Sequence, residues 1–235
     1  RAIGSALACV ARAGSACPNT SANQGRAVSG TCAIRQGSNC PWAGALAAAV
    51  GAGVGVGPAV ASGAGARGKV GAERVRWIVG DARALDPSDR VDLAVMTANV
   101  FQVFPTAELA LETLRAVRAR IRLGGHLMFE ARVPARKAWL EWGPKESRSV
   151  TDIDGVGPVE AWSEVTSVEL PLVTFRWWHR VPGAGLLASD STLRFWERGE
   201  VEALVAAAGF EAVQVRDAPD RPGREYVFVC RAVGE

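Results

Sequence analysis

Residues 75 to 130 constrain the fold most, because they place three strand-like runs and one amphipathic helix at short spacing. The runs are rich in Val, Ile and other apolar residues and are bounded by turn residues. They cover 75–79, 91–96 and 126–130. Leu and Val recur with a helical period over 107–121, and Gly124 and Gly125 are expected to end that helix. This order of elements predicts a parallel α/β sheet.

The residues after 130 predict a different arrangement. A short helix is expected over 134–142 and a polar loop over 145–159. Alternating residues and a Pro-Gly-Ala-Gly turn at 182–185 predict three antiparallel strands. These strands cover 159–167, 168–181 and 186–195. A helix over 197–209, with Val201, Leu204 and Val205 inward, and two strands over 210–216 and 225–231 are expected to close the chain.

Three stretches carry a resemblance to a known family. They are Val-Arg-Trp-Ile-Val-Gly-Asp-Ala-Arg at 75–83, Asp-Leu-Ala-Val-Met-Thr-Ala-Asn-Val at 92–100 and Arg-Leu-Gly-Gly-His-Leu-Met-Phe-Glu at 122–130. In this order and spacing they resemble motifs of the class I S-adenosylmethionine-dependent methyltransferases, particularly small actinobacterial-type members. With the downstream segments, the resemblance covers roughly residues 53 to 232. It implies a Rossmann-like, mostly parallel sheet with an antiparallel last strand and an inserted antiparallel β region, about 159–195, over the substrate.

The resemblance implies S-adenosylmethionine as cofactor and a set of residues that contact it. Asp81 would accept the adenine amino hydrogens, and the backbone N–H of Ala82 would meet a ring nitrogen. A turn-capping role is the alternative for Asp81. The sulfonium would lie where the fourth strand closes. The implied cofactor residues are Gly55, Gly57, Asp81, Ala82, Arg83, Thr97, Ala98 and Asn99.

The first part of the chain departs from the family pattern. Gly57 stands where the family has an acid that binds the ribose hydroxyls. The nearest counterparts of the first strand and glycine loop, 29–34 and 37–40, lack the acid and the glycine spacing. The string Gly-Ala-Gly-Ala-Arg-Gly at 63–68 fits a dinucleotide motif, but too few residues follow for the required helix, so we interpret it as coincidence.

The inserted strands and the strand ends supply the substrate candidates. Gln102, Arg132, Arg176 and His179 are candidate pocket residues, while Phe101 and Phe104 are expected in the core. The sulfonium is an activated methyl donor, so no catalytic dyad is required and no catalytic residue is assigned. If a general base acts, the alternatives are Glu130, His179 and Asp190.

Composition bounds the remaining alternatives. The 235 residues, 49% hydrophobic with a net charge of +3, suit one globular domain and give no argument for nucleic acid. We predict an irregular, poorly ordered arm over 1–41 and a methyltransferase-like domain over 42–235. The uncharged run between Arg35 and Arg67 is expected to be buried rather than membrane-spanning, and the protein is expected to be cytoplasmic. The four cysteines before residue 41 match no zinc pattern, so no metal is expected.

Methyl transfer to a small molecule is the leading hypothesis. The second is a methyltransferase-fold protein whose cofactor site has degenerated, in nature or through an error in the recorded sequence, because the first 72 residues contain no Asp or Glu. The third is a nicotinamide-dependent oxidoreductase. The methyl acceptor and the oligomeric state stay open.

Overall fold

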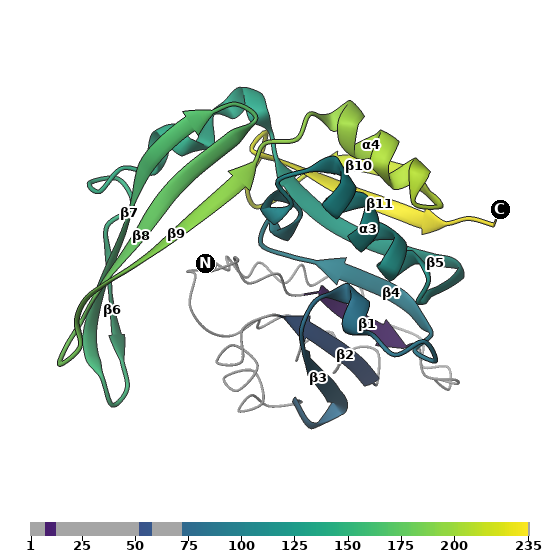
Figure 1. Ribbon diagram of the computed structural model, residues 1–235, viewed down its shortest axis with the longest axis horizontal. Coiled ribbons are helices and arrows are strands. Elements are labelled where there is room, and N and C mark those ends of the chain that lie inside the picture. Colours follow the sequence, from purple (N-terminus) through teal and green to yellow (C-terminus); the bar gives the residue numbers. More distant parts are fainter. Residues whose placement is uncertain (1–7, 13–51, 58–71, 235) are drawn as a thin grey trace, which may run out of the picture.

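The computed structural model describes residues 8–12, 52–57 and 72–234, which form two β-sheets and two α-helices (Figure 1). The larger sheet has seven strands in the order β10-β11-β5-β4-β1-β2-β3. The smaller has four, in the order β6-β7-β8-β9. Figure 1 shows this second sheet projecting from the first, beyond the points where β5 ends and α4 begins. A mixed α/β sheet of this kind is Rossmann-like.

Chain order reverses in the middle of the seven-stranded sheet. From β1 (Ala8–Arg12) the chain continues outward to β2 (Ala52–Gly57) and β3 (Val75–Val79). β4 (Val91–Met96) lies on the other side of β1 and is followed outward by β5 (Ile121–Arg132). β2 pairs with β3, and β4 with β5, in parallel. Such a reversal point is where ligands bind in open α/β sheets.

The strand at this reversal point corrects one prediction. β1 lies within the segment that the sequence predicted to be an irregular arm, and it pairs antiparallel with both β2 and β4. Ala8 pairs with Met96 and with Val56, so the amino end of β1, not its carboxyl end, lies at the ligand edge. The predicted counterparts 29–34, 37–40 and 63–68 lie outside the described residues.

The helix α3 (Ala107–Arg118) ends earlier than predicted. Its start is as expected, because the Thr106 side chain accepts a hydrogen bond from the Leu109 N–H. Residues 121–125, predicted to finish and stop the helix, belong to β5 instead. A Cβ on Gly125 would lie 2.8 Å from the Asp92 carbonyl oxygen, so this glycine allows close approach of β5 to β4. Leu109, one of the apolar residues of the helical repeat, is exposed, whereas Leu114 and Val117 are buried.

The second sheet is larger than predicted. β6 (Ser149–Ile153) lies in the expected polar loop, and the three expected strands are β7 (Gly157–Glu169), β8 (Leu172–Val181) and β9 (Gly185–Arg194). All pairings are antiparallel. The predicted helix over 134–142 is two short 3₁₀ turns, Pro134–Arg136 and Ala138–Glu141. Alternation was too weak in the exposed β6 to distinguish a strand from a loop.

The C-terminal elements match the sequence pattern. The helix α4 (Arg198–Ala207) begins with a capping box between Glu197 and Glu200. β10 (Phe210–Asp217) and β11 (Glu225–Ala232) follow as an antiparallel pair, and β11 pairs antiparallel with β5.

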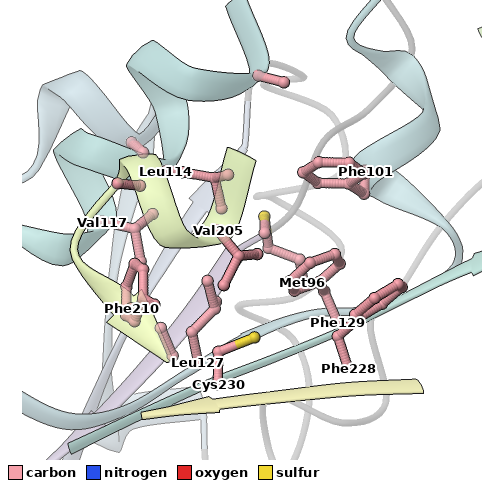
Figure 2. Packing of buried hydrophobic residues seen from close by; sticks show 14 of the residues in the cluster. Met96, Phe101, Leu114, Val117, Leu127, Phe129, Val205, Phe210, Phe228 and Cys230 are labelled. Atoms are coloured by element: carbon pink, nitrogen blue, oxygen red, sulfur yellow. The ribbon is translucent and has the colours of Figure 1, made fainter. Parts of the chain in front are cut away.

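One hydrophobic core holds α3 and α4 on the seven-stranded sheet (Figure 2). Leu114, Val117 and Val205 point from the helices toward the strands. Phe101, predicted to be a core residue, is fully buried against Phe129 and Trp196. This core fixes the carboxyl ends of β4 and β5, where the polar side chains of the site begin.

Candidate functional site

Asp81 lies directly beyond the carboxyl end of β3. Its carboxylate accepts a hydrogen bond from the backbone N–H of Arg83 at 2.9 Å and thereby caps a 3₁₀ turn, Ala82–Ala84. The Arg83 guanidinium also binds both carboxylate oxygens, with the shortest N···O distance 2.6 Å. These bonds with Arg83 lower the pKa of the Asp81 carboxyl. The side chain is 46% exposed, so the carboxylate is accessible to a ligand that can compete with Arg83.

Gly55 and Gly57 belong to β2, beside β3. A Cβ on Gly55 would lie 2.4 Å from a carbon of the Trp77 ring, so this position requires glycine for packing. The Gly57 carbonyl accepts a hydrogen bond from the Gly80 N–H at 3.0 Å. Neither residue offers a side chain to a ligand. Gly55 therefore has a structural role that the sequence did not predict.

The segment after β4 forms an unusual turn. Ala98 and Asn99 both have left-handed backbone conformations, with φ of 61° and 57°. Two successive non-glycine residues of this kind are energetically costly and persist where the surroundings fix them. Here the backbone N–H of Asn99 donates to the Glu130 carboxylate at 3.1 Å. The turn thus aims a backbone N–H at the Glu130 carboxylate at the strand reversal point.

Four side chains close a ring around this turn, which we call the carboxylate ring: Asn99, Glu130, Arg221 and Glu225. The Asn99 amide donates to Glu225 Oε1 at 2.7 Å, and Arg221 donates to the same oxygen at 2.7 Å. Arg221 also lies 3.8 Å from the second oxygen of Glu130. Asn99 and Glu225 are 2% and 3% exposed, and the ring ties the ends of β4 and β5 to β11.

Glu130 is a member of the carboxylate ring with a raised pKa. Burial raises the pKa of its carboxyl, and the charge of Glu225 raises it further. Arg221 and the N–H groups of the turn oppose that shift. A carboxylate with a raised pKa is a better proton acceptor near neutral pH than an ordinary glutamate.

Arg132 lies two residues farther along β5, at the junction of the two sheets. Its Nη1 donates to Gln102 Oε1 at 2.8 Å, and its guanidinium carbon lies 5.3 Å from the centre of the Trp142 ring. Gln102 is fully buried and donates to the Arg194 carbonyl of β9 at 3.2 Å. The structure therefore brings the side chains of Gln102 and Arg132 together.

The other predicted pocket residues do not join this group. Arg176 and Asp190 bind each other through two hydrogen bonds, 2.6 and 2.9 Å, on an exposed part of the second sheet. His179 stacks on Trp177, with ring centres 6.2 Å apart. In the described chain, no hydrogen bond or ion pair connects any of the three to Arg132 or to the carboxylate ring. Of the three candidate bases, Glu130 alone belongs to that ring.

Several solved structures share the overall fold of this chain. The chain is similar to the CcbJ methyltransferase from Streptomyces caelestis, with a TM-score of 0.59 and 16% identity over 77% of this chain and 74% of that one. It is similar to the sugar N-methyltransferase KedS8 from Streptoalloteichus sp. ATCC 53650, with a TM-score of 0.56 and 17% identity over 77% and 71%. The chain has the fold of the class I S-adenosylmethionine-dependent methyltransferases.

A third methyltransferase of this fold was solved with S-adenosylmethionine bound. It is the amino pentose methyltransferase CalS10 from Micromonospora echinaspora, with a TM-score of 0.51 and 22% identity over 77% of this chain and 73% of that one. No protein-family model and no curated protein matches the sequence. In the part of the chain that the structure describes, no helix is long and apolar enough to cross a membrane, and no three His, Cys, Asp or Glu side chains gather as a metal site.

Sequence reasoning missed Arg221 and Glu225. The signal available was an acid at the start of the largely apolar β11, with an arginine four residues earlier in the preceding turn. That signal is weak, because the partner residues Asn99 and Glu130 lie far away in the sequence.

We expect Asn99→Gly to be more stable than Asn99→Ala by about 1 kcal/mol. Both substitutions remove the bond to Glu225, but glycine adopts the left-handed conformation without steric cost. Urea denaturation of the two variants measures the difference. Ala98→Gly is the matched control, since it relieves the same backbone strain without removing a side-chain bond, and it should not lower stability. Equal stability of the two Asn99 variants would contradict the strain argument.

Proposed function

We propose that this protein is an enzyme that transfers a methyl group from S-adenosylmethionine to a small molecule. The observation that carries the proposal is the left-handed turn at Ala98 and Asn99, which is fixed by Glu130 at the strand reversal point of a methyltransferase fold. Backbone strain that the surroundings hold in place gathers at functional sites. The similar solved proteins are named as methyltransferases, and this supports the same reaction here.

The residue at the end of β3 fits the cofactor, but the residue at the end of β2 does not. Asp81 presents a half-exposed carboxylate at the strand end, a suitable acceptor for the amino group of adenine. Gly57 offers no carboxylate to the ribose, so ribose binding has to come from other groups. At β4, the Ala98–Asn99 turn is compatible with a cationic sulfonium, because the carboxylate ring supplies negative charge nearby. Bound S-adenosylmethionine would supply an already activated methyl group.

The chain's own residues then have to orient the acceptor and accept its proton. We assign proton acceptance to the Glu130 carboxylate, since its pKa is raised by burial and by Glu225. Arg221 limits that rise and holds the carboxylate toward the turn. The cluster of Trp139, Trp142 and Phe195 lies beside Arg132 and would exclude water from the acceptor.

Titration of the purified protein with S-adenosylhomocysteine tests this proposal. Asp81→Ala should weaken binding roughly 10-fold to 100-fold, because a hydrogen bond to a charged group is worth about 1.5 to 3 kcal/mol. Asp86→Ala is the matched control: it removes an acid bonded to Ser88 in the next turn, away from the strand end. It should bind the ligand as the parent does.

Thermal unfolding of each variant separates ligand effects from the loss of the turn cap at Asp81. Absence of binding by the folded parent protein would overturn the proposed function. Equal binding by the parent and Asp81→Ala would remove Asp81 from the cofactor site and leave the methyltransferase proposal to acceptor assays.

A further inference from the structure

Arg132 is a half-buried cation without an ion-pair partner. Of its five N–H donors, the side chain uses one, on Gln102 Oε1, and no acid among the described residues forms an ion pair with it. Glu225 and Glu130 act on it only through longer-range charge. Buried and half-buried charges in proteins are normally paired with an opposite charge. The Arg132 guanidinium therefore has room for an anion that the described residues do not supply.

Two other partly buried arginines in the described chain make more contacts than Arg132 does. Arg118 donates through all three nitrogens to the backbone carbonyls of Gly209, Ile121 and Val233. Arg194 donates to the Pro105 carbonyl and forms an ion pair with Glu200. These two arginines connect elements of the fold. Arg132 makes fewer contacts than these two, and its one side-chain bond goes to a neutral amide. Arg120 also makes a single bond, to the Leu85 carbonyl, but its unpartnered Nε is buried.

The unused donors of Arg132 are open to a ligand. The side-chain atoms that are both buried and unpartnered include Asn99 Oδ1 and Glu225 Oε2, but no atom of Arg132. Its Nε and Nη2 have no protein acceptor and are not sealed, whereas the two oxygens of the carboxylate ring are sealed from solvent. These two nitrogens are therefore not fully enclosed by the protein.

We propose that Arg132 binds a carboxylate group of the methyl acceptor, which is therefore an anionic small molecule. The inference rests on the proposed function, since it places the anion at the carboxyl end of β5, beside the carboxylate ring. A guanidinium presents two parallel N–H donors in the geometry that a planar carboxylate accepts. The face of Trp142 holds the guanidinium plane in place.

A singly charged anion suits this position better than a phosphate dianion. The negative charges of Glu225 and Glu130 lie close enough to Arg132 to affect its pKa. They would repel a second negative charge on a ligand bound there. Arg221 offsets part of that repulsion but is already held by Glu225 and Glu130. The free N–H donors of Arg132 are therefore suited to one planar group that carries a single negative charge.

Benzoate and benzamide form a matched pair of probes, because they have nearly the same shape and differ in charge. We expect the parent protein, saturated with S-adenosylhomocysteine, to bind benzoate at least roughly 10-fold more tightly than benzamide. Arg132→Met should remove that preference. Arg122→Met is the matched control: it lies at the other end of the same strand, pairs with Asp92, and should leave the preference unchanged. Protein-observed NMR titration measures the affinities of the parent and both variants for the two probes.

Arg132→Lys covers the case in which Arg132→Met does not fold, since it keeps the charge but loses the paired donors. It should bind benzoate more weakly than the parent but still prefer it to benzamide. Three results would overturn the inference: equal binding of benzoate and benzamide by the parent, an unchanged preference in folded Arg132→Met, or undiminished benzoate binding by Arg132→Lys. The proposed function fails separately, if S-adenosylhomocysteine itself does not bind. In that event the probes are titrated alone, and the same outcomes decide the role of Arg132.

Discussion

Arg221→Met is expected to lower the free energy of unfolding by about 2 to 3 kcal/mol at neutral pH. The substitution leaves Glu225, which is 3% exposed, as a buried carboxylate without its cation. Breaking a fully buried pair costs about 3 to 5 kcal/mol, and the smaller figure reflects solvent access to Arg221, which is 39% exposed. Urea denaturation of the variant and the parent measures the difference.

Arg224→Met is the control for this experiment. Arg224 lies three residues away and pairs with Glu141, but both side chains are more than half exposed, so little stability should be lost. The effect at Arg221 should also shrink as the pH falls. Burial and Glu225 raise the pKa of Glu130, so its protonated form is favoured in the fold, and protonation removes the repulsion that Arg221 offsets. A loss equal to that of Arg224→Met would contradict the assigned role of Arg221.

Phe228→Ala is expected to lower the free energy of unfolding by about 3 to 5 kcal/mol. Phe228 is fully buried in β11 and stacks on Phe129 of β5, with ring centres 5.0 Å apart (Figure 2). Its removal leaves a cavity in the layer that holds the strand ends of the site. Chemical denaturation of the variant gives the loss directly.

Val213→Ala in the neighbouring strand β10 is the matched control. Val213 is 44% exposed, so its truncation removes little buried surface and should change stability by less than about 1 kcal/mol. A similar loss in the two variants would mean that β10 and β11 do not differ in burial as the structure describes.

Several elements of the sheet follow from the sequence alone. β3 and β4 have the predicted limits, because each is a short run of β-branched and apolar residues between turn residues. α3 has the predicted start for a local reason, the cap at Thr106, and its end differs for a nonlocal one. The glycines at 124 and 125 are typical of a helix stop, yet pairing with β4 draws residues 121–125 into β5.

The candidate site likewise has residues that the local sequence predicts and contacts that it does not predict. Asp81 and Asn99 could be placed from the sequence, because the carboxyl ends of strands are visible in the local pattern. The bond between Asn99 and Glu225 spans 126 positions in the chain, and no local pattern encodes it. The sequence by itself determined which segments become strands and helices, and it supplied the polar residues at the strand ends. Only the tertiary structure decided which of these meet, because the pairing of β11 with β5 brings Glu225 and Arg221 against the turn after β4.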